Sequence, residues 1–396
     1  MSVTSEVLYI FKDKYDDDSV VKSITRDHPL LDRIPRKGSF TGKGEFYSIK
    51  TSNTQGVAND IDSARTAAST SLGKQPYLER FAKYGVIQLN GESMHAAADG
   101  GAFYDLVTEQ SDSIMEEMGN SMAHDLYGDG SGVRGRVASV NGNILTLTNP
   151  DDVRYFPLGM TVIADNNASG ASPKVGSTTV TAFDDDTGTV TVANAAAANI
   201  AQDDYLFRYG ENASCLEGLA LCTPLVAPTA GDSFRGIDRS TAVRLLAGAR
   251  IDDTATAIEE NIRLAALKVR NNGMRGKQDA FFLNPLSFHT ICTRLNAKVV
   301  YEGAMSDASV YHETISVVTP AGTLKLISDQ DCPTDRGYGV LMAEHAIRHL
   351  EGLPHIIRDD GRPSLRLTSG DGIEIQMRAW WNYRQRMPSC FSVISI

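Results

Sequence analysis

The sequence lacks the patches of positive charge that nucleic-acid-binding proteins use. No run of five or more lysines or arginines occurs, and 49 acidic residues outnumber 38 basic ones, which gives a net charge of −11. A protein that grips phosphates needs concentrated positive charge. The composition therefore argues against tight nucleic-acid binding and leaves only non-specific proximity to DNA.

Cysteines and long apolar runs are also scarce. The five cysteines are odd in number and never stand in the CxxC spacing of a metal knuckle. No stretch approaches the roughly 18 uninterrupted apolar residues of a membrane helix. Acidic residues occupy the N-terminal positions where a signal peptide has its apolar core. We therefore expect a cytoplasmic protein with reduced thiols and no membrane partner.

Three short patterns resemble catalytic or binding motifs, and each has a simpler interpretation. Gly130–Gly135 matches the dinucleotide fingerprint GxGxxG, but it follows a predicted helix and enters a strand, the reverse of the required order. The cluster Asp184–Gly188 lacks the alternating ligands of a calcium loop and indicates a turn. His345 and His349 lie on a predicted helix without a third zinc ligand, so we interpret them as surface histidines. We predict no enzymatic activity, catalytic residue, cofactor or metal site.

Residues 40–90 contain two strand-like runs that flank a long polar segment. The runs are Phe40–Thr51 and Tyr77–Leu89, both rich in aromatic and β-branched residues. The first run alternates between two faces, with Phe46, Ser48 and Lys50 on one and Tyr47 and Ile49 on the other. A lone ribbon with a tip as long as Ser52–Gln75 is marginally stable in water, so it needs a surface outside its own domain. This pattern favours assembly over catalysis.

The next part of the chain predicts one long helix and an all-β insert. Apolar residues recur at three- and four-residue steps over 101–127, which is typical of a helix about 40 Å long. Six short β-runs follow within 133–209, and Asn141-Gly142 between the first two is a strong hairpin signal. Short strands at this spacing predict a small inserted barrel or sandwich.

Mixed α and β patterns fill the remainder. Residues 254–272 predict an amphipathic helix with Asp253 as its N-cap. A buried strand, Asp279–Leu283, runs into Asn284-Pro285, an N-cap followed by the residue best suited to a first helical position. A last alternating strand spans Ile373–Ala379.

The order of these elements resembles that of the major capsid protein of tailed bacteriophages. The resemblance rests on the arm HPLLDRIPRKGSFTGKGEFYSI, on the strand-to-helix step DAFFLNPLSF, and above all on the succession of arm, long loop, long helix and mixed domain. It covers the chain apart from residues 133–209. It implies an α+β fold with an N-terminal arm, an extended β-hairpin loop, a spine helix, and peripheral and apical domains, to which this chain adds the inserted barrel or sandwich.

The resemblance also implies domain boundaries. We expect the arm at 1–39, the extended loop at 40–90, the peripheral domain with the spine helix at 91–132, the insert at 133–209, a mainly apical domain at 210–350 and a C-terminal return to the peripheral domain at 351–396.

The function implied is a virion shell, assembled in the host cytoplasm from hexamers and pentamers of this chain around double-stranded DNA. The implied partners are further copies, a portal protein at one vertex and a decoration protein. Some family members carry a scaffolding segment ahead of the arm. Here the loop begins by residue 40, so we expect a separate scaffolding protein.

In this family the extended loop lies across a neighbouring subunit. The residues that we expect at such assembly contacts are Phe46, Tyr47, Ile49, Lys50, Arg65, Lys74, Tyr77, Phe81 and Tyr84. Some members also form a lysine–asparagine cross-link. Because neither a partner asparagine nor an assisting glutamate is identified here, we do not predict that bond.

Two alternatives stay open. An encapsulin-like compartment has the same fold and encloses cargo enzymes instead of DNA. A soluble hydrolase with a β-rich carbohydrate-binding insert predicts a monomer or small oligomer with a cleft, whereas either shell predicts megadalton particles.

Overall fold

The computed structural model describes most of the chain from residue 28 onward. The described residues are 28–38, 40–70, 72–91, 102–271, 276–295, 314–319, 321–358, 361, 364–367 and 370–396. Residues 1–27 of the predicted arm therefore lie outside them. The chain divides into two compact units, Met1–His124 with Thr223–Ile396, and Asp125–Cys222. We call these the main unit and the barrel unit.

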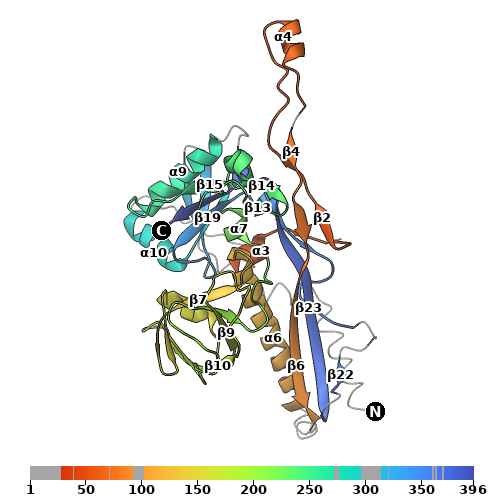
Figure 1. Ribbon diagram of the computed structural model, residues 1–396, viewed down its shortest axis with the longest axis vertical. Coiled ribbons are helices and arrows are strands. Elements are labelled where there is room, and N and C mark those ends of the chain that lie inside the picture. The colour runs from red at the N-terminus through yellow and green to blue at the C-terminus, as the bar shows by residue number, and fades with distance from the viewer. Residues whose placement is uncertain are drawn as a thin grey trace. The chain divides into compact units, whose positions relative to one another are not determined.

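The main unit contains a six-stranded sheet built around one long strand, β23 (Gly372–Gln385) (Figure 1). Strand β6 (Phe81–Asn90) pairs antiparallel with it along one edge. The other strands of this sheet are β20 (His345–His349), β21 (His355–Ile356), β22 (Leu365–Arg366) and β1 (Arg36–Lys37). We call this the long sheet. The predicted last strand at Ile373–Ala379 is confirmed as part of β23.

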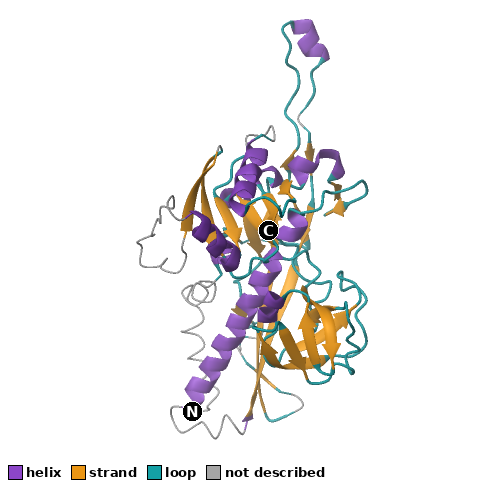
Figure 2. Cartoon of the chain, turned by 90° about the vertical axis from the view of Figure 1, so that its left-hand side faces the viewer, coloured by secondary structure: helices purple, strands orange, loops and turns teal. Residues whose placement is uncertain are grey.

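Helix α6 (Ala102–Tyr127) lies against one face of the long sheet (Figure 2). Its buried apolar residues include Met115, Met118, Met122 and Leu126. Gly85 on β6 allows the close approach, because a Cβ built there would lie 2.7 Å from Met118 Sδ. Lys83 Nζ, also on β6, donates to Ser121 Oγ at 2.6 Å. The predicted helix at 101–127 is thus confirmed within one residue.

A second, mixed sheet in the main unit has the strand order β15-β24-β19-β16-β18-β17. In that order the strands are Ala249–Ile251, Ser392–Ser395, Arg336–Val340, Ala280–Leu283, Gly322–Ser328 and Thr314–Thr319. Helices α9 (Ile258–Arg270) and α10 (Pro285–Leu295) pack on it through an apolar cluster that includes Phe281 and Ile291.

The beginnings of these two helices test the sequence-based expectations. Asn284 Oδ1 accepts from the backbone N–H of Leu286 at 3.0 Å, so the strand-to-helix step is confirmed. Asp253 is not an N-cap, because α9 begins at Ile258. Its Oδ1 instead accepts from the N–H of Ala255 at 2.9 Å, which forms a turn before the helix.

The C-terminal segment contributes a strand to each of the two large sheets of the main unit. Strand β23 belongs to the long sheet, whereas β24 lies inside the mixed sheet between β15 and β19. Val393 and Ile394 are completely buried there. Burial of this apolar end therefore ties the C-terminus to the second sheet.

The barrel unit is a closed barrel with the strand order β10-β11-β8-β7-β12-β9. In that order the strands are Thr178–Asp184, Thr189–Val192, Ile144–Leu147, Val133–Asn141, Tyr205–Arg208 and Thr161–Asp165. All six predicted β-runs are strands, and they form a barrel and not a sandwich. Gly142 has a φ of +61°, the conformation that the tight Asn141-Gly142 turn requires.

Short elements complete the described chain. The helical ones outside the loop are α3 (Pro29–Arg33), α7 (Leu219–Cys222), α8 (Val243–Leu246), η1 (Pro150–Tyr155), η2 (Ser240–Ala242), η3 (Met342–Glu344) and η4 (Pro388–Cys390). A small hairpin joins β13 (Ser233–Phe234) to β14 (Ile237–Asp238).

A buried histidine fastens the start of the described chain to the main unit. His28 Nδ1 lies 2.5 Å from Asp331 Oδ2, and Nε2 lies 3.0 Å from Asn120 Oδ1 on α6. Burial by itself lowers the pKa of His28, but the hydrogen bond with Asp331 and the charges of Asp331 and Asp329 raise it above its ordinary value. Helix α3 follows, with Leu30 and Leu31 buried.

Candidate assembly surface

Two short antiparallel strand pairs form a ribbon in the main unit (Figure 1). Strand β2 (Gly44–Phe46) pairs with β5 (Tyr77–Glu79), and β3 (Ile49–Lys50) pairs with β4 (Gly73–Lys74). The predicted first strand, Phe40–Thr51, is therefore two shorter ones.

The second predicted run, Tyr77–Leu89, is also divided. Its first part is β5 in the ribbon, while β6 pairs with β23 in the long sheet. The ribbon accordingly spans residues 44–79 and not the whole of 40–90. Phe40 is completely buried, and its N–H donates to the carbonyl of His349 at 3.2 Å, so it belongs to the body of the main unit.

None of the described residues 51–70 and 72–75 at the tip of the ribbon is buried. It carries the short helix α4 (Ile61–Thr66), whose N-cap Asp60 accepts from the N–H of Ser63 at 3.0 Å. Hydrogen bonds with Ser63 lower the pKa of Asp60. Three large apolar side chains, which we call the tip residues, are exposed here: Val57 at 86%, Ile61 at 68% and Leu72 at 64%. Single exposed apolar residues are ordinary, but three on one hairpin make the tip a candidate assembly surface.

The base of the ribbon, in contrast, is fixed to the main unit. Arg235 Nη1 donates to Tyr47 Oη at 3.0 Å, and Arg235 Nη2 donates to the carbonyl of Tyr383 on β23 at 2.9 Å. The carbonyl of Arg235 accepts from the N–H of Tyr77 at 3.0 Å. Asn382 Nδ2, also on β23, donates to the carbonyl of Glu79 at 2.5 Å. The ribbon thus has a held base and an uncovered tip.

The predicted contact residues fall into three groups by exposure. Phe46, Lys50, Arg65 and Tyr84 are exposed, and Lys74, Tyr77 and Phe81 are partly buried. Tyr47 and Ile49 are only 7% and 2% exposed, and Tyr47 contacts Arg235 of its own subunit. The alternation predicted for this run is confirmed by the same burial pattern. The tip residues were not predicted, because isolated apolar residues in a polar segment carry no periodic signal.

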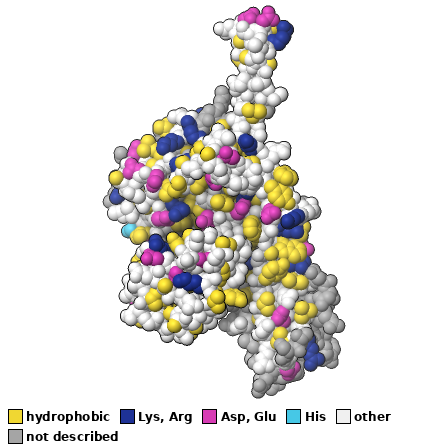
Figure 3. All heavy atoms as spheres, viewed as in Figure 1, with side chains coloured by type: hydrophobic (Ala, Val, Ile, Leu, Met, Phe, Trp, Pro, Cys, Tyr) yellow, Lys and Arg dark blue, Asp and Glu magenta, His cyan; other side chains and the backbone are white. Residues whose placement is uncertain are grey.

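A second, partly exposed surface lies on the face of the long sheet opposite α6. On β6, Tyr84 is 59% exposed and Val86 is 49% exposed. On β23, Trp380 Nε1 donates to Tyr84 Oη at 3.2 Å, and the guanidinium of Arg378 lies 4.2 Å from the centre of the Trp380 ring. Hydrophobic side chains are visible on this part of the main unit below the ribbon (Figure 3). We call this surface the sheet face.

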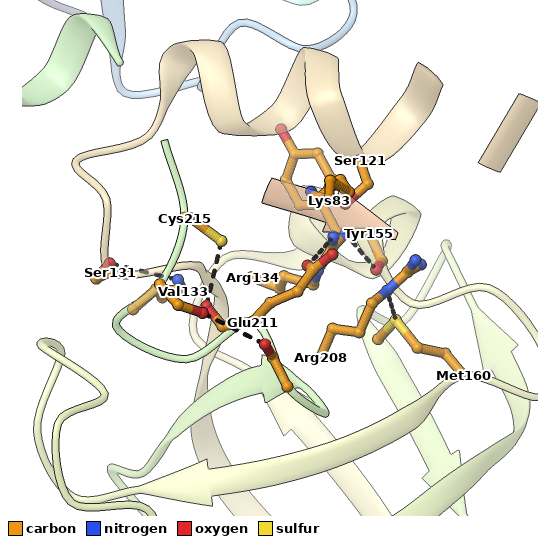
Figure 4. A network of polar contacts seen from close by, with 12 residues as sticks. Lys83, Ser121, Ser131, Val133, Arg134, Tyr155, Met160, Arg208, Glu211 and Cys215 are labelled. Carbon is orange, nitrogen blue, oxygen red and sulfur yellow. Dashed lines mark hydrogen bonds and ion pairs between the residues drawn. The ribbon is translucent and has the colours of Figure 1, made fainter. Parts of the chain in front are cut away.

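The GxGxxG segment leads from α6 into β7 and lies beside a buried ion pair of the barrel unit (Figure 4). Arg134 Nη2 donates to Glu211 Oε2 at 2.7 Å, and Cys215 Sγ donates to the carbonyl of Glu211 at 3.2 Å. Ligand atoms of Asp125, Glu211 and Cys215 lie within 4.8 Å of one another, a set that could hold a metal ion.

Arg134 already supplies positive charge to that group. Burial by itself lowers the pKa of Arg134, but the charges of Glu211 and Asp125 raise it above its ordinary value. The guanidinium of Arg134 contacts Glu211 and also feels the charge of Asp125, so it supplies positive charge where a cation would otherwise supply it. The ion pair between Arg134 and Glu211 therefore links the first and the last part of the chain in the barrel unit.

The two histidines considered for zinc are not on a helix. His345 and His349 are the first and last residues of strand β20, and His345 is only 2% exposed. Burial lowers the pKa of His345 to about 3. Its Nδ1 lies 3.3 Å from Tyr383 Oη and its Nε2 lies 3.3 Å from Met342 Sδ. His345 is thus a neutral core residue and not the surface histidine that we expected.

The turn predicted at Asp184–Gly188 is confirmed. Asp184–Gly188 forms the turn between β10 and β11, with Asp184 Oδ1 accepting from the N–H of Asp186 at 3.0 Å. All five cysteines are free, and only Cys292 is partly exposed. Within the described chain, no helix is long and apolar enough to span a bilayer.

Comparisons with known proteins agree with this architecture at the level of fold. No protein-family model and no curated protein matches the sequence. Among solved structures, the capsid of cyanophage A-1(L) is similar with a TM-score of 0.50 at 12% identity, over 93% of this chain and 92% of that chain. The SrpI encapsulin of Synechococcus elongatus matches with a TM-score of 0.46 at 7% identity, over 92% and 86% of the two chains. A virus-like particle of Pyrococcus furiosus gives 0.41 at 8% identity, over 95% and 96%.

The likeness to the cyanophage capsid shows the fold. The chain has the tailed-phage major capsid fold that the order of its elements predicted, with the extended loop, the spine helix α6 and an added six-stranded barrel. The fold class inferred from sequence is thereby confirmed.

Proposed function

We propose that this chain is the major capsid protein of a tailed bacteriophage, which assembles into hexamers and pentamers of an icosahedral shell around double-stranded DNA. The observation that carries the proposal is the ribbon, whose base is held by Arg235 and Asn382 while Val57, Ile61 and Leu72 stay exposed at its tip. In a chain with a capsid fold, a neighbouring copy supplies the surface that the tip needs.

The energetics of such a shell depend on repetition. Each tip buries only a few apolar side chains, so one contact is weak. The tip of each copy contacts a different surface on the next copy. Such head-to-tail contacts between unlike surfaces close into rings. Further contacts within a ring then act at high effective concentration, so many weak contacts give a stable particle. The exposed sheet face offers a second surface for these contacts.

The charge of the chain suits an enclosed genome. A net charge of −11 repels a polyanion, so the shell would surround packaged DNA without adhering to it. Assembly needs burial and not turnover, so the function requires no catalytic residue. We further propose a separate scaffolding protein, a portal protein and a decoration protein as partners, with assembly in the host cytoplasm and a final location in the virion.

Imaging and chromatography of the purified full chain, with and without its scaffolding partner, test this proposal. We expect closed megadalton particles by size exclusion and negative staining. Nuclease-protected DNA in particles from infected cells would support the phage shell, whereas protein-filled particles without nucleic acid would favour the encapsulin alternative. A subunit-sized species at every concentration tested would refute both shells and favour the hydrolase.

A further inference from the structure

A three-residue ion cluster joins the base of the ribbon to the long sheet. Glu45 on β2 meets Arg348 on β20 and Arg384 on β23. Arg348 donates from Nε and Nη2 to Glu45 Oε2 at 3.1 and 2.6 Å, and Arg384 donates from Nη1 to Glu45 Oε1 at 2.8 Å. Both carboxylate oxygens are therefore engaged, each by a different strand of the sheet. We call this cluster the clamp.

The clamp is well shielded from solvent. The side chains of Glu45, Arg348 and Arg384 are 23%, 14% and 17% exposed. Charge-assisted hydrogen bonds in such surroundings are stronger and more directional than surface ion pairs. The two guanidinium groups come from paired strands, with Ala346 opposite Arg384 and Arg348 opposite Asn382. Glu45 accepts hydrogen bonds from both guanidinium groups, so removal of its charge leaves two positive groups without the carboxylate that joins them.

The contacts of Arg235 and Asn382 also hold the base of the ribbon, whereas the described hydrogen bonds of residues 51–72 are internal to it. The N–H groups of Thr51 and Ser52 both donate to the carbonyl of Leu72, at 2.9 and 3.1 Å. The strand pairs are only three and two residues long and are interrupted at Tyr47 and Ser48. A narrow ribbon of this kind resists bending weakly, so its direction is set at the base.

Because the ribbon is long, a small change of its direction at the base moves the tip by a large distance. The segment of about 15 residues from Phe46 to Ile61 can span at most ~50 Å. A rotation of about 5° at the base then moves a tip ~40 Å away by roughly 3 Å. A shift of that size is comparable to the width of an apolar side chain and would change where the tip meets its neighbour.

We propose that Glu45, Arg348 and Arg384 are positioning residues that fix the angle of the ribbon and thereby set the curvature of the shell. The inference rests on the proposed function, since it assigns to the clamp the control of particle size. The tip residues provide the apolar contact with the neighbouring copy, and the clamp sets the angle at which the ribbon reaches that copy.

The test uses the full chain with Glu45→Gln, which keeps the shape of the side chain and removes its charge. We expect particles whose distribution of diameters in electron micrographs is at least twofold wider than that of the wild type. The matched control is Glu260→Gln on α9, which breaks an exposed pair with Arg263 at 3.7 Å and should leave the distribution unchanged. Wild-type diameters in the Glu45→Gln particles would overturn the inference.

An exchange of charges guards against a merely structural effect. The double variant Glu45→Arg with Arg384→Glu keeps one carboxylate and two guanidinium groups at the same place. We expect it to narrow the distribution again, and a distribution as wide as that of Glu45→Gln would contradict the proposed pairing. If Glu45→Gln does not fold, Arg348→Lys takes its place in the test. Lysine keeps the positive charge but lacks the paired N–H donors of the guanidinium, so we expect the same widening of the diameter distribution.

A measurement on dissociated subunits separates this inference from the proposed function. Spin labels at Ala67→Cys near the tip and His289→Cys on α10, in a Cys292→Ser background, report the angle of the ribbon whether or not shells form. We expect the distance distribution to be at least twofold broader in Glu45→Gln than with Glu45 intact. Equal distributions would refute the clamp even if particles form, whereas a broadened distribution without any particles would refute the shell alone.

Discussion

Replacing the tip residues should abolish assembly without weakening the subunit. We consider the triple substitution of Val57, Ile61 and Leu72 by serine. All three side chains are mostly exposed in the subunit, at 86%, 68% and 64%, and no residue of α4 is buried. Substitutions at such positions usually change the free energy of unfolding by less than about 0.5 kcal/mol. The melting temperature of the dissociated subunit should therefore stay the same.

The effect on assembly should be much larger. Complete burial of an aliphatic side chain contributes about 2 kcal/mol, so burying the exposed parts of the three tip residues contributes roughly 4 kcal/mol per contact. Loss of 4 kcal/mol corresponds to about a thousandfold change in the equilibrium constant of that contact. Because a shell repeats the contact in every copy, the protein concentration needed for assembly should rise beyond practical reach.

Light scattering of subunits over a concentration series measures this threshold. A matched control is Val175→Ser in the barrel unit, since Val175 is 86% exposed like Val57 but lies far from the ribbon in sequence. We expect the control to assemble at the wild-type threshold. Normal assembly of the triple variant, or a large fall in its melting temperature, would refute the argument that the tip is completed by a neighbouring copy.

Three further predictions concern the body of the protein. Gly85→Ala should lower the free energy of unfolding of the main unit by about 1–3 kcal/mol in denaturant unfolding, because the new Cβ would lie 2.7 Å from Met118 Sδ. The control Gly370→Ala, which has open space around it, should leave the free energy of unfolding unchanged. With the pKa of His345 lowered to about 3, only the unfolded chain binds this proton between pH 6.5 and 3. The free energy of unfolding should therefore fall by about 1.4 kcal/mol for each pH unit of acidification within this window, and His345 should have no effect on it above the window. In the His345→Gln variant this contribution to the pH dependence of the free energy of unfolding should be absent. The barrel unit, Asp125–Cys222, should unfold cooperatively when expressed alone, because its strands close on themselves; a broad, non-cooperative melt by circular dichroism would contradict this.

Local periodicity was sufficient to predict most elements of the fold. The stripe of α6 repeats over seven turns of helix, and each barrel strand is a short β-run set off by turn residues, so neighbours in sequence carry the signal. The order of these elements then indicated the capsid fold.

The choice of strand partners could not be predicted in the same way. The alternation of β6 suits a ribbon with residues 40–51 as well as it suits the long sheet. Only the distant strand β23, nearly 300 residues later, decides between them. His345 and His349 show the same ambiguity, because residues four apart share a face on a helix and on a strand alike.

The tertiary contacts at the base of the ribbon could not be predicted from the sequence. Aromatic and basic residues of the ribbon were expected to contact a neighbour, yet Tyr47 turns inward to Arg235, a residue far along the chain. Glu45 was not among the expected contact residues, and its two arginine partners come from the distant strands β20 and β23. Pairings of this kind arise from tertiary contacts, on which a single sequence carries little information.

Hydrogen exchange of the ribbon tip in free subunits and in assembled particles tests the central claim most directly. None of residues 53–70 is buried in the subunit, so their amides should exchange almost at the rate of an unfolded chain. In particles the same amides should become strongly protected, while those of the barrel interior stay unchanged. Strong protection of the tip in the free subunit, or none in the particle, would contradict the account.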